Sequence, residues 1–385
     1  MPEAAENIVI AGAGPVGAVC ALALKQGGLD PLVLEARPVD APLSDRRTLA
    51  LSYGSRLLLE RLGVWARIGD ATPITRIHIS HRGGLGRAML SAAEEKLPAL
   101  GYVLSYGELA QALMDELKAA SVRMRFGVEA RRAQAQGGMA ELQLGGDAPE
   151  ILHARLAVIA DGGRGEDTPP AKWSHDYAQV AVVAEVQTEM PHRNLAYERF
   201  TPGGPIALLP KGDKYALVWV NAPDEAARIA QLSDADFLAE LQRRFGNRQG
   251  RFLAVHSRGQ FPLRLDYRGT DAGQHVVRIG NAAQTLHPVA GQGFNLGLRD
   301  AWELAESCLQ AAPGTLGSAA QLARFAAGRR RDALPGIGFT DFLVRAFSTT
   351  NPIAHHLRGL GLMALQALPP ARHFVARRML FGKNG

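Results

Sequence analysis

Apolar positions at the start of the chain come in short runs separated by helical patterns. Residues 8–11 (IVIA) and 31–34 (PLVL) are strand-like runs, and a helical pattern lies between them and extends to Lys25. A buried strand, a helix and a second buried strand are the parts of a parallel βαβ unit. The pattern therefore predicts an α/β architecture at the N-terminus.

Several later segments continue this architecture. Helical patterns are predicted at residues 104–118 and 296–309, strands at 122–128, 156–162 (LAVIADG) and 275–279 (HVVRI), and a hairpin at 133–152.

The middle of the chain has a different character. Residues 179–186, 195–201, 206–209, 215–220 and 253–260 alternate apolar and polar positions or form short apolar runs, and residues 234–245 have a helical pattern. Strands this short and closely spaced are typical of an antiparallel sheet. Residues 74–80 (ITRIHIS) predict a further strand, and we expect them and the glycine-rich stretch that follows to join this second sheet.

These patterns predict two interleaved domains and a helical end. We expect a discontinuous α/β domain at residues 1–74, 99–175 and 262–330. An inserted, mainly antiparallel domain is expected at 75–98 and 176–261, and a helical region at 331–385. A chain of 385 residues exceeds the size at which one core usually stops growing, which agrees with this division.

Composition narrows the class of protein. With 47% hydrophobic and 21% charged residues the chain can bury a large core. Cys20 and Cys308 both fall in apolar helical patterns and predict buried thiols in a reducing compartment, without a disulfide or a metal site. No run of eighteen apolar residues is present, and the N-terminus is acidic where a signal peptide is basic, so we expect a cytoplasmic protein.

The net charge of +6 leaves several anionic partners open. We expect no nucleic acid, because the arginines are not interleaved with stacking aromatics, which make up 6% of the residues. No catalytic Ser/His/Asp arrangement or phosphate-binding loop is apparent, which is the pattern of an enzyme whose cofactor carries the chemistry.

The first strand runs into a glycine-rich turn, Gly12-Ala13-Gly14-Pro15-Val16-Gly17. This G-x-G-x-x-G spacing between a strand and a helix lets a pyrophosphate approach the backbone at the helix N-terminus. Glu35 ends the second strand, where a carboxylate can accept the ribose hydroxyls of an adenosine. The turn predicts a dinucleotide cofactor and leaves FAD and NAD open.

A second glycine-rich corner spans residues 280–301, GNAAQTLHPVAGQGFNLGLRDA, between a strand and a helix. This motif resembles the second flavin-binding motif of the single-component aromatic hydroxylases in the para-hydroxybenzoate hydroxylase fold group. The resemblance implies an FAD-binding Rossmann-like domain with an inserted substrate-binding β domain and a C-terminal helical segment. It also implies NAD(P)H as co-substrate.

The same resemblance implies which residues contact FAD. Besides Gly12, Gly14, Pro15, Val16, Gly17 and Glu35, they are Arg47, Gln111, Asp161, Gly162, Gly280, Asn281, Gly291, Gln292, Gly293, Phe294 and Asn295. His287 and Pro288 lie where the family places a carbonyl nearest the reacting oxygen, and the helix near Gly293 is expected to stabilise the reduced ring. The family's serine after Asp161-Gly162 is missing, which leaves the nicotinamide contacts of this segment open.

Over its whole length the chain resembles the ubiquinone-biosynthesis branch of these hydroxylases. Within that branch the motif is most similar to the 2-octaprenyl-6-methoxyphenol hydroxylases. The resemblance implies that reduced flavin captures O₂ as a hydroperoxide and that a prenylated phenol attacks it. A sister hydroxylase for another ring position and an FAD oxidoreductase that inserts no oxygen remain as alternatives.

Arginines are frequent at the C-terminal end, set among apolar helical patterns. They are Arg329, Arg330, Arg331, Arg345, Arg358, Arg372, Arg377 and Arg378, against Asp332 and Asp341. Two hypotheses remain open for this region. It is either a basic helical cap over the core, or a surface that docks on the inner face of the membrane or on another ubiquinone-biosynthesis protein.

Overall fold

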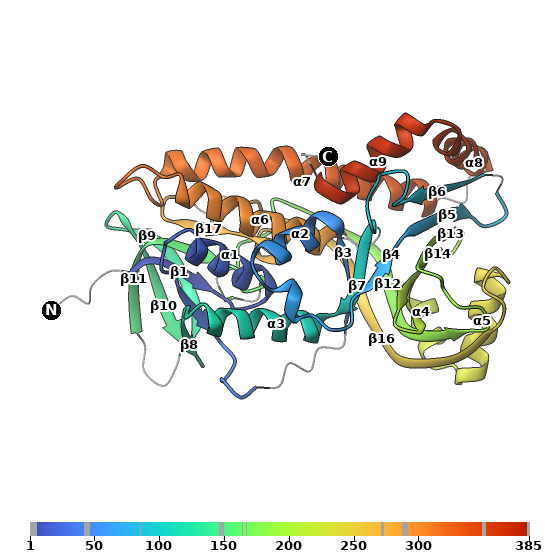
Figure 1. Cartoon of the computed structure of the whole chain (residues 1–385), viewed down its shortest axis with the longest axis horizontal. Helices are drawn as coiled ribbons and strands as arrows, with labels where there is room; N and C mark the ends of the chain where they lie inside the picture. The colour runs from blue at the N-terminus through green and yellow to red at the C-terminus, as the bar shows by residue number, and fades with distance from the viewer. Residues whose placement is uncertain are drawn as a thin grey trace.

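The computed structural model describes most of the chain. The described residues are 6–41, 47–84, 86–145, 150–163, 165–166, 168–270, 273–286, 292–348 and 352–382, with the backbone alone at 292, 339–340, 342–348 and 352–357. They form an α/β part, an eight-stranded part and a helical layer over both (Figure 1).

The α/β part is built on a seven-stranded sheet. Its order is β8 (Arg123–Phe126), β2 (Leu32–Glu35), β1 (Glu6–Ala11), β11 (Glu150–Ile159), β10 (Met139–Gly145) and β9 (Glu129–Gln136), with β17 (Val276–Arg278) also paired to β11. β1 is parallel to β2 and β11, and β11 is parallel to β17. Parallel strands end at the same edge, so the turns that follow β1, β2, β11 and β17 all lie along one side of the sheet.

Helices α1 (Pro15–Gln26), α3 (Tyr106–Ala119) and α6 (Gln292–Leu309) pack on this sheet. Nine of the twelve residues of α1 are buried, because the helix is apolar all round and lies between α3, α6 and the strands. Both cysteines are buried and free in this core, as predicted. Burial raises the pKa of both thiols, which keeps them protonated.

The eight-stranded sheet is mainly antiparallel. Its order is β18 (Gln284–Thr285), β16 (Phe252–Tyr267), β12 (Trp173–Thr188), β15 (Lys214–Asn221), β14 (Gly204–Lys211), β13 (Leu195–Thr201), β5 (Arg76–His81) and β6 (Arg87–Ser91). The excursion predicted after residue 74 therefore joins this sheet, through a parallel pairing of β5 with β13.

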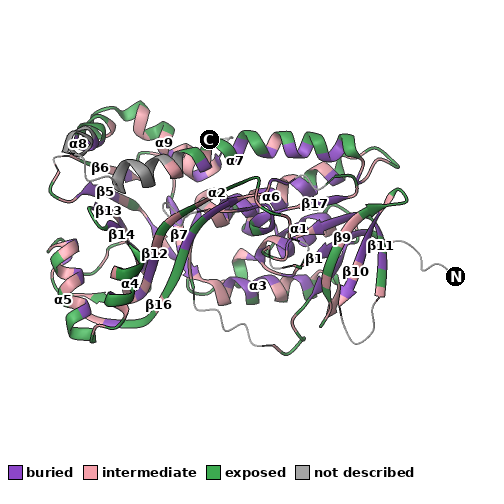
Figure 2. Ribbon diagram, turned by 180° about the vertical axis from the view of Figure 1, so that it is seen from behind, coloured by how far each residue is buried: buried purple, intermediate pink, exposed green. Residues whose placement is uncertain are grey.

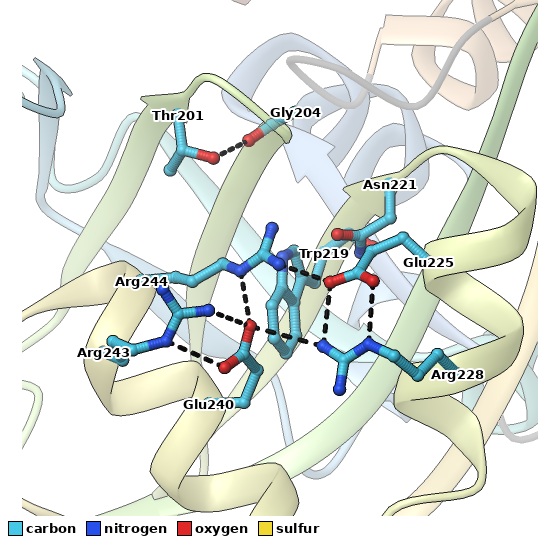
Figure 3. Close-up of polar contacts among 9 residues, drawn as sticks. All are labelled: Thr201, Gly204, Trp219, Asn221, Glu225, Arg228, Glu240, Arg243 and Arg244. Carbon is cyan, nitrogen blue, oxygen red and sulfur yellow. Dashed lines mark hydrogen bonds and ion pairs between the residues drawn. The ribbon is translucent and has the colours of Figure 1, made fainter.

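One face of this sheet is covered by α4 (Pro223–Ala230) and α5 (Asp234–Phe245), which pack on Trp219 and Tyr215. Between the two helices, Glu225 and Glu240 bind three arginines in a network that lies over Trp219 (Figure 3). This face is closed by packing and ion pairs, so a substrate would have to use the opposite face.

A three-stranded sheet joins the two parts, in the order β3 (Thr48–Ser52), β7 (Gly101–Ser105) and β4 (Thr72–Ile74). The expected domain boundaries at 175/176 and 261/262 fall inside β12 and β16, two sixteen-residue strands paired along most of their length. The two parts are therefore joined through continuous strands rather than linkers.

Helices cover the top of the molecule (Figure 1). They are α2 (Tyr53–Arg61), α7 (Ala319–Ser348), α8 (Pro352–Ala367) and α9 (Pro369–Phe381), and short 3₁₀ turns span Trp65–Arg67 and Gly280–Ala282. α7 runs without a break across the boundary expected at 330/331, with Pro335 inside it. The predicted helical end thus begins in a helix that also packs on the α/β part. In the described part of the chain, no helix is long and apolar enough to cross a membrane.

Candidate cofactor site

The three glycines of the first turn meet different surroundings. A Cβ atom on Gly12, whose φ is +106°, would lie 2.6 Å from the carbonyl oxygen of Ala160, and one on Gly17 would lie 2.0 Å from the carbonyl oxygen of Gly12. A Cβ on Gly14 would meet nothing closer than the hydroxyl of Tyr106, at 4.0 Å. Gly12 and Gly17 are thus required by the protein's own packing, whereas Gly14 faces space. That space lies at the N-terminus of α1, where a phosphate binds well.

Glu35 closes this turn from the end of β2. Its carboxylate accepts hydrogen bonds from the backbone N–H of Ala13 at 2.9 Å and from the Nε of Arg37 at 2.7 Å. Burial alone would raise the pKa of this carboxyl group, but the hydrogen bonds and charge of Arg37 outweigh it and lower the pKa. Glu35 is therefore an ionised acceptor next to the glycine turn, as the ribose contact requires.

Tyr106 adds a side chain to the pyrophosphate position that the sequence interpretation did not include. It begins α3, directly after the helix cap Ser105, and its hydroxyl is the nearest atom to the space over Gly14. The guanidinium of Arg47 lies 4.9 Å from the centre of the Tyr106 ring. Arg47 thus lies next to a side chain that reaches the first turn, and its contact with FAD stays a prediction. In the sequence, the capping pattern of Ser105 and Glu108 marks the start of this helix, and it is the signal that could have pointed to Tyr106 as the first helical residue.

The second glycine corner packs directly on the first. Gly280 has φ of +60°, and a Cβ on it would lie 3.0 Å from the side chain of Val16 in α1. A Cβ on Gly297 of α6 would also lie 3.0 Å from Val16. Val16 therefore contacts both glycines of the second motif, which the sequence separates from it by more than 260 residues.

The corner is held by a buried ion pair. Asp300 accepts hydrogen bonds from the backbone N–H of Gly280 at 3.1 Å and from the amide of Gln284 at 3.0 Å. Its other oxygen accepts from the Nε of Arg329 at 2.6 Å, and Arg329 also lies 3.1 Å from Asp332. Asp300 ends the sequence motif, whereas its partner Arg329 was counted among the C-terminal arginines, for which a helical cap over the core and a docking surface were both left open. Arg329 lies in the core with 1% of its surface exposed.

The turn after β11 lies beside the second motif. The carboxylate of Asp161 accepts hydrogen bonds from the backbone N–H groups of Gly163 at 2.8 Å and Gly165 at 3.1 Å, so it organises its own loop. A Cβ on Gly163 would lie 3.2 Å from the carbonyl oxygen of Asn281. Gly162 and Asn281 are both exposed along this edge. The three predicted segments therefore converge at one side of the sheet.

The start of α6 agrees with the predicted helix N-terminus near Gly293. The buried amide of Asn295 bonds to β3, accepting from the N–H of Ser52 at 2.8 Å and donating to the carbonyl of Ala50 at 3.0 Å. Phe294 is half-buried against the α1 core. The predicted flavin contacts of Phe294 and Asn295 remain predictions, and Asn295 additionally docks α6 on the three-stranded sheet.

The remaining predicted residues either show no contact with the glycine turns or lie outside the described residues. Gln111 is exposed on α3 and donates to Asp115 of the same helix at 2.8 Å, so its contact with FAD stays a prediction. His287, Pro288 and Gly291 lie outside the described residues, and so does the side chain of Gln292.

The arrangement fits FAD. The ionised acceptor at Glu35, the open space over Gly14 and the start of α6 are the groups that the adenosine, the pyrophosphate and the flavin would need, respectively. A cavity of about 730 Å³ lies elsewhere, on the outer side of α6 around Trp302 and Phe325, and touches none of the glycine turns. Within the described residues no cluster of His, Cys, Asp or Glu could hold a metal ion.

The family model described as an FAD binding domain matches residues 6–333. The ubiquinone hydroxylase UbiL of Rhodospirillum rubrum is 33% identical, over 97% of this chain and 89% of that protein. The 3-demethoxyubiquinol 3-hydroxylase of Escherichia coli is 32% identical, over 94% of each chain.

Solved structures share the fold at lower identity. The p-nitrophenol 4-monooxygenase PnpA of Pseudomonas putida superposes with a TM-score of 0.78 at 18% identity, over 98% of this chain and 99% of that one. Klebsiella pneumoniae HpxO, complexed with FAD and uric acid, superposes with a TM-score of 0.74 at 17% identity, over 98% of both chains.

Proposed function

The chain belongs to the family of FAD-binding aromatic hydroxylases that includes the ubiquinone hydroxylases, and we propose that it hydroxylates the ring of a prenylated phenol in ubiquinone biosynthesis. It is an FAD-dependent monooxygenase whose co-substrates are NAD(P)H and O₂. We assign the ring position to that of 2-octaprenyl-6-methoxyphenol hydroxylation, with another position on the same ring as the alternative.

One structural observation supports a substrate with a prenyl chain. A small apolar cavity of about 70 Å³ begins at Ser52 and Asn295, beside the start of α6, and leads to the last turn of α9. Its walls are Ile74, Ile77, Leu90, Leu100, Ala376, Met379 and Leu380. A prenyl chain needs such an apolar path, because each buried methylene contributes about 0.8 kcal/mol. The cavity is too small for a whole prenyl chain, so it would hold only the part next to a ring that faces the flavin.

FAD supplies hydride acceptance from NAD(P)H and the activation of O₂. The protein's part is to hold the cofactor at Gly14, Glu35 and the Gly280 corner, and to direct the positive end of α6 at the ring. Apolar walls around the substrate exclude water, which would otherwise compete for the activated oxygen.

The test is NAD(P)H-dependent oxygen uptake by the FAD-loaded protein with a prenylated phenol, followed by mass analysis of the product. We expect one oxygen atom added per NAD(P)H consumed. Oxidation of NAD(P)H without any hydroxylated product would instead support the oxidoreductase that inserts no oxygen.

We also propose that the protein meets its lipid-borne substrate at a membrane surface. Of the C-terminal arginines first considered, three are engaged within the protein. Arg358 is buried beside His81, which agrees with the helical cap over the core and takes this residue out of a docking surface. Arg372 lies 3.3 Å from Glu94, and Arg377 stacks on Phe381.

A different basic cluster supports this proposal. Arg82 and Arg87, at the β5–β6 hairpin, lie near Arg199 and Arg248, and within the described part none of Arg82, Arg87 and Arg248 has an ion-pair partner. Burial first, and then the charges of Arg248 and Arg82, lower the pKa of Arg199 to about 10. Cations crowded together without carboxylates favour an anionic surface as partner.

Exposed apolar side chains lie next to this cluster. Met363 of α8 packs against Gly86 at the hairpin, and the backbone N–H of Met89 donates to Gln366. Leu360 and Met363 are 60% and 49% exposed, and α8 and α9 carry long exposed stretches (Figure 2). Basic and apolar groups side by side fit the headgroup region of an anionic bilayer.

Co-sedimentation with vesicles tests the membrane contact. The double variant Arg87→Glu/Arg248→Glu should lose binding to vesicles containing phosphatidylglycerol at low salt, and neutral vesicles should bind weakly throughout. The matched control is Arg131→Glu/Arg132→Glu on β9, which makes the same charge change at the far end of the molecule. Equal binding by both double variants would overturn the membrane contact and favour a carrier protein.

A further inference from the structure

A carboxyl group lies on the inner face of the eight-stranded sheet. Glu198 is in the middle of β13, paired across to Ala207 of β14 and Ile79 of β5. Its neighbour Tyr197 points to the other face, into the core under α5. Because side chains alternate along a strand, Glu198 shares its face with Ala196 and not with the packed helical side.

That inner face is the one turned toward the cofactor part. Ala196 packs on Ile74 of β4 and Val103 of β7, and α7 contacts both β13 and β14. On the same face of β5, next to Ile79, Ile77 lines the apolar cavity that begins at Asn295. Glu198 therefore lies on the same face of the sheet as Ile77, which lines the cavity beside the start of α6.

Glu198 has no hydrogen-bond or ion-pair partner within the described part of the chain. Its side chain keeps some accessible surface, yet burial raises its pKa to about 7 and is the sole cause of that shift. The carboxyl group is thus desolvated by the surrounding protein although part of its surface stays accessible. Buried polar groups in native proteins are normally paired, so this one requires an explanation.

Other titratable groups near this face are already paired. Lys211 of β14 binds Glu185 of β12 at 2.6 Å. His81 of β5 contacts Arg358 of α8, and Asp341 of α7 accepts from the hydroxyl of Tyr177. None of these groups contributes to the pKa of Glu198.

We propose that Glu198 is the catalytic base that accepts the proton of the substrate's phenol hydroxyl group. This rests on the proposed function. In the step, the phenol O–H bond breaks, an O–H bond forms on the Glu198 carboxylate, and the electron pair left on oxygen enriches the ring for attack on oxygen activated by the reduced flavin. As the new C–O bond forms, the O–O bond of the activated oxygen breaks, and the second oxygen atom leaves as water with the two electrons that NAD(P)H supplied. The attacked ring carbon then loses its proton and the proton on Glu198 returns to the phenol oxygen, so NAD(P)H and O₂ are the only other reactants.

The environment suits this task. A general base works best when its pKa lies close to the working pH, and a desolvated carboxylate is a much better acceptor than an exposed one. The surrounding side chains of Ile79, Ala196 and Ala207 are apolar or small, so they leave the carboxylate free for the phenol.

The test compares Glu198→Gln with the parent, both loaded with FAD. We expect hydroxylation of a neutral phenol to fall by about 10² or more, within the range for general-base catalysis. The parent's rate should rise with pH through about 7 as the carboxylate ionises, whereas the variant's rate should be flat over that range. Glu141→Gln, which changes a buried glutamate of β10 in the same way, is the matched control and should behave as the parent.

A second substrate separates catalysis from structure. A phenol already ionised at the assay pH, such as a nitrophenol, needs no base, so parent and Glu198→Gln should hydroxylate it at similar rates. Loss of both substrates alike would show a structural role and overturn the proposal, as would an unchanged pH profile for the neutral phenol. If instead the parent itself hydroxylates no phenol, the proposed function is what fails.

Discussion

Asp300 and Arg329 form an ion pair of 2.6 Å that no solvent reaches, and the same carboxylate holds the backbone of Gly280. Burial raises the pKa of Asp300, and the charge of Arg329 opposes that rise. The position of the second glycine corner thus depends on an arginine in α7, which extends into the helical layer.

Replacing Asp300 by Asn should destabilise the protein by about 3–5 kcal/mol, because Arg329 would be left as a buried charge without its closest partner. Urea unfolding of the FAD-free protein measures this. Glu60→Gln, which breaks the exposed Arg56–Glu60 pair, is the control and should cost about 0–1 kcal/mol. A cost as small as that of Glu60→Gln would contradict the role given to the buried pair.

Substitutions of two glycines in the first turn should distinguish a loss of FAD binding from a loss of folding stability. Gly14→Glu should leave the unfolding midpoint of the FAD-free protein unchanged, because a side chain there enters open space, but should abolish FAD absorbance. Gly17→Ala should lower the midpoint and FAD binding together, since its Cβ would lie 2.0 Å from a carbonyl oxygen. Full flavin absorbance in Gly14→Glu would remove the pyrophosphate from this turn.

Glu35→Ala should weaken FAD binding by about 1–3 kcal/mol through the loss of a charged acceptor. Because the pKa of Glu35 is lowered in the folded protein, its contribution to stability is present above about pH 4.5 and is lost as the pH falls through the folded value. Fluorimetric titration with FAD at neutral pH measures the first effect, and urea unfolding of the FAD-free parent and variant at neutral pH and at pH 4 measures the second. Unchanged affinity at neutral pH would place the ribose elsewhere.

Glu198→Gln should stabilise the protein at alkaline pH, whatever its effect on catalysis. The folded pKa of about 7 lies above the ordinary value of 4.5, so the parent loses stability as the pH rises between these values. The difference between these two values corresponds to roughly 3 kcal/mol. Thermal unfolding should show the variant more stable than the parent at pH 8 and nearly equal at pH 4. Equal stability at pH 8 would mean that the carboxylate is solvated.

Local sequence determined the elements around the cofactor. The strand, glycine turn and helix at residues 6–26, and Glu35 at the end of β2, follow from neighbouring residues alone. The backbone conformation of Gly12 and the packing of Gly17 involve contacts that any chain with this spacing must make. The family, the FAD cofactor and the two-part fold could therefore be predicted before any coordinates.

Only the tertiary structure decided which charges are buried and which are free. In the sequence, Arg329, Arg358, Arg87 and Arg248 are similar arginines in helical or polar stretches. Folding brings Arg329 onto Asp300 and Arg358 onto His81, and it leaves Arg87 and Arg248 without partners in the described part. Likewise, nothing near Glu198 in sequence indicates desolvation, because the elements that enclose it come from β5, β14 and α7. Partners far apart in the chain set burial and charge, and a local pattern does not contain them.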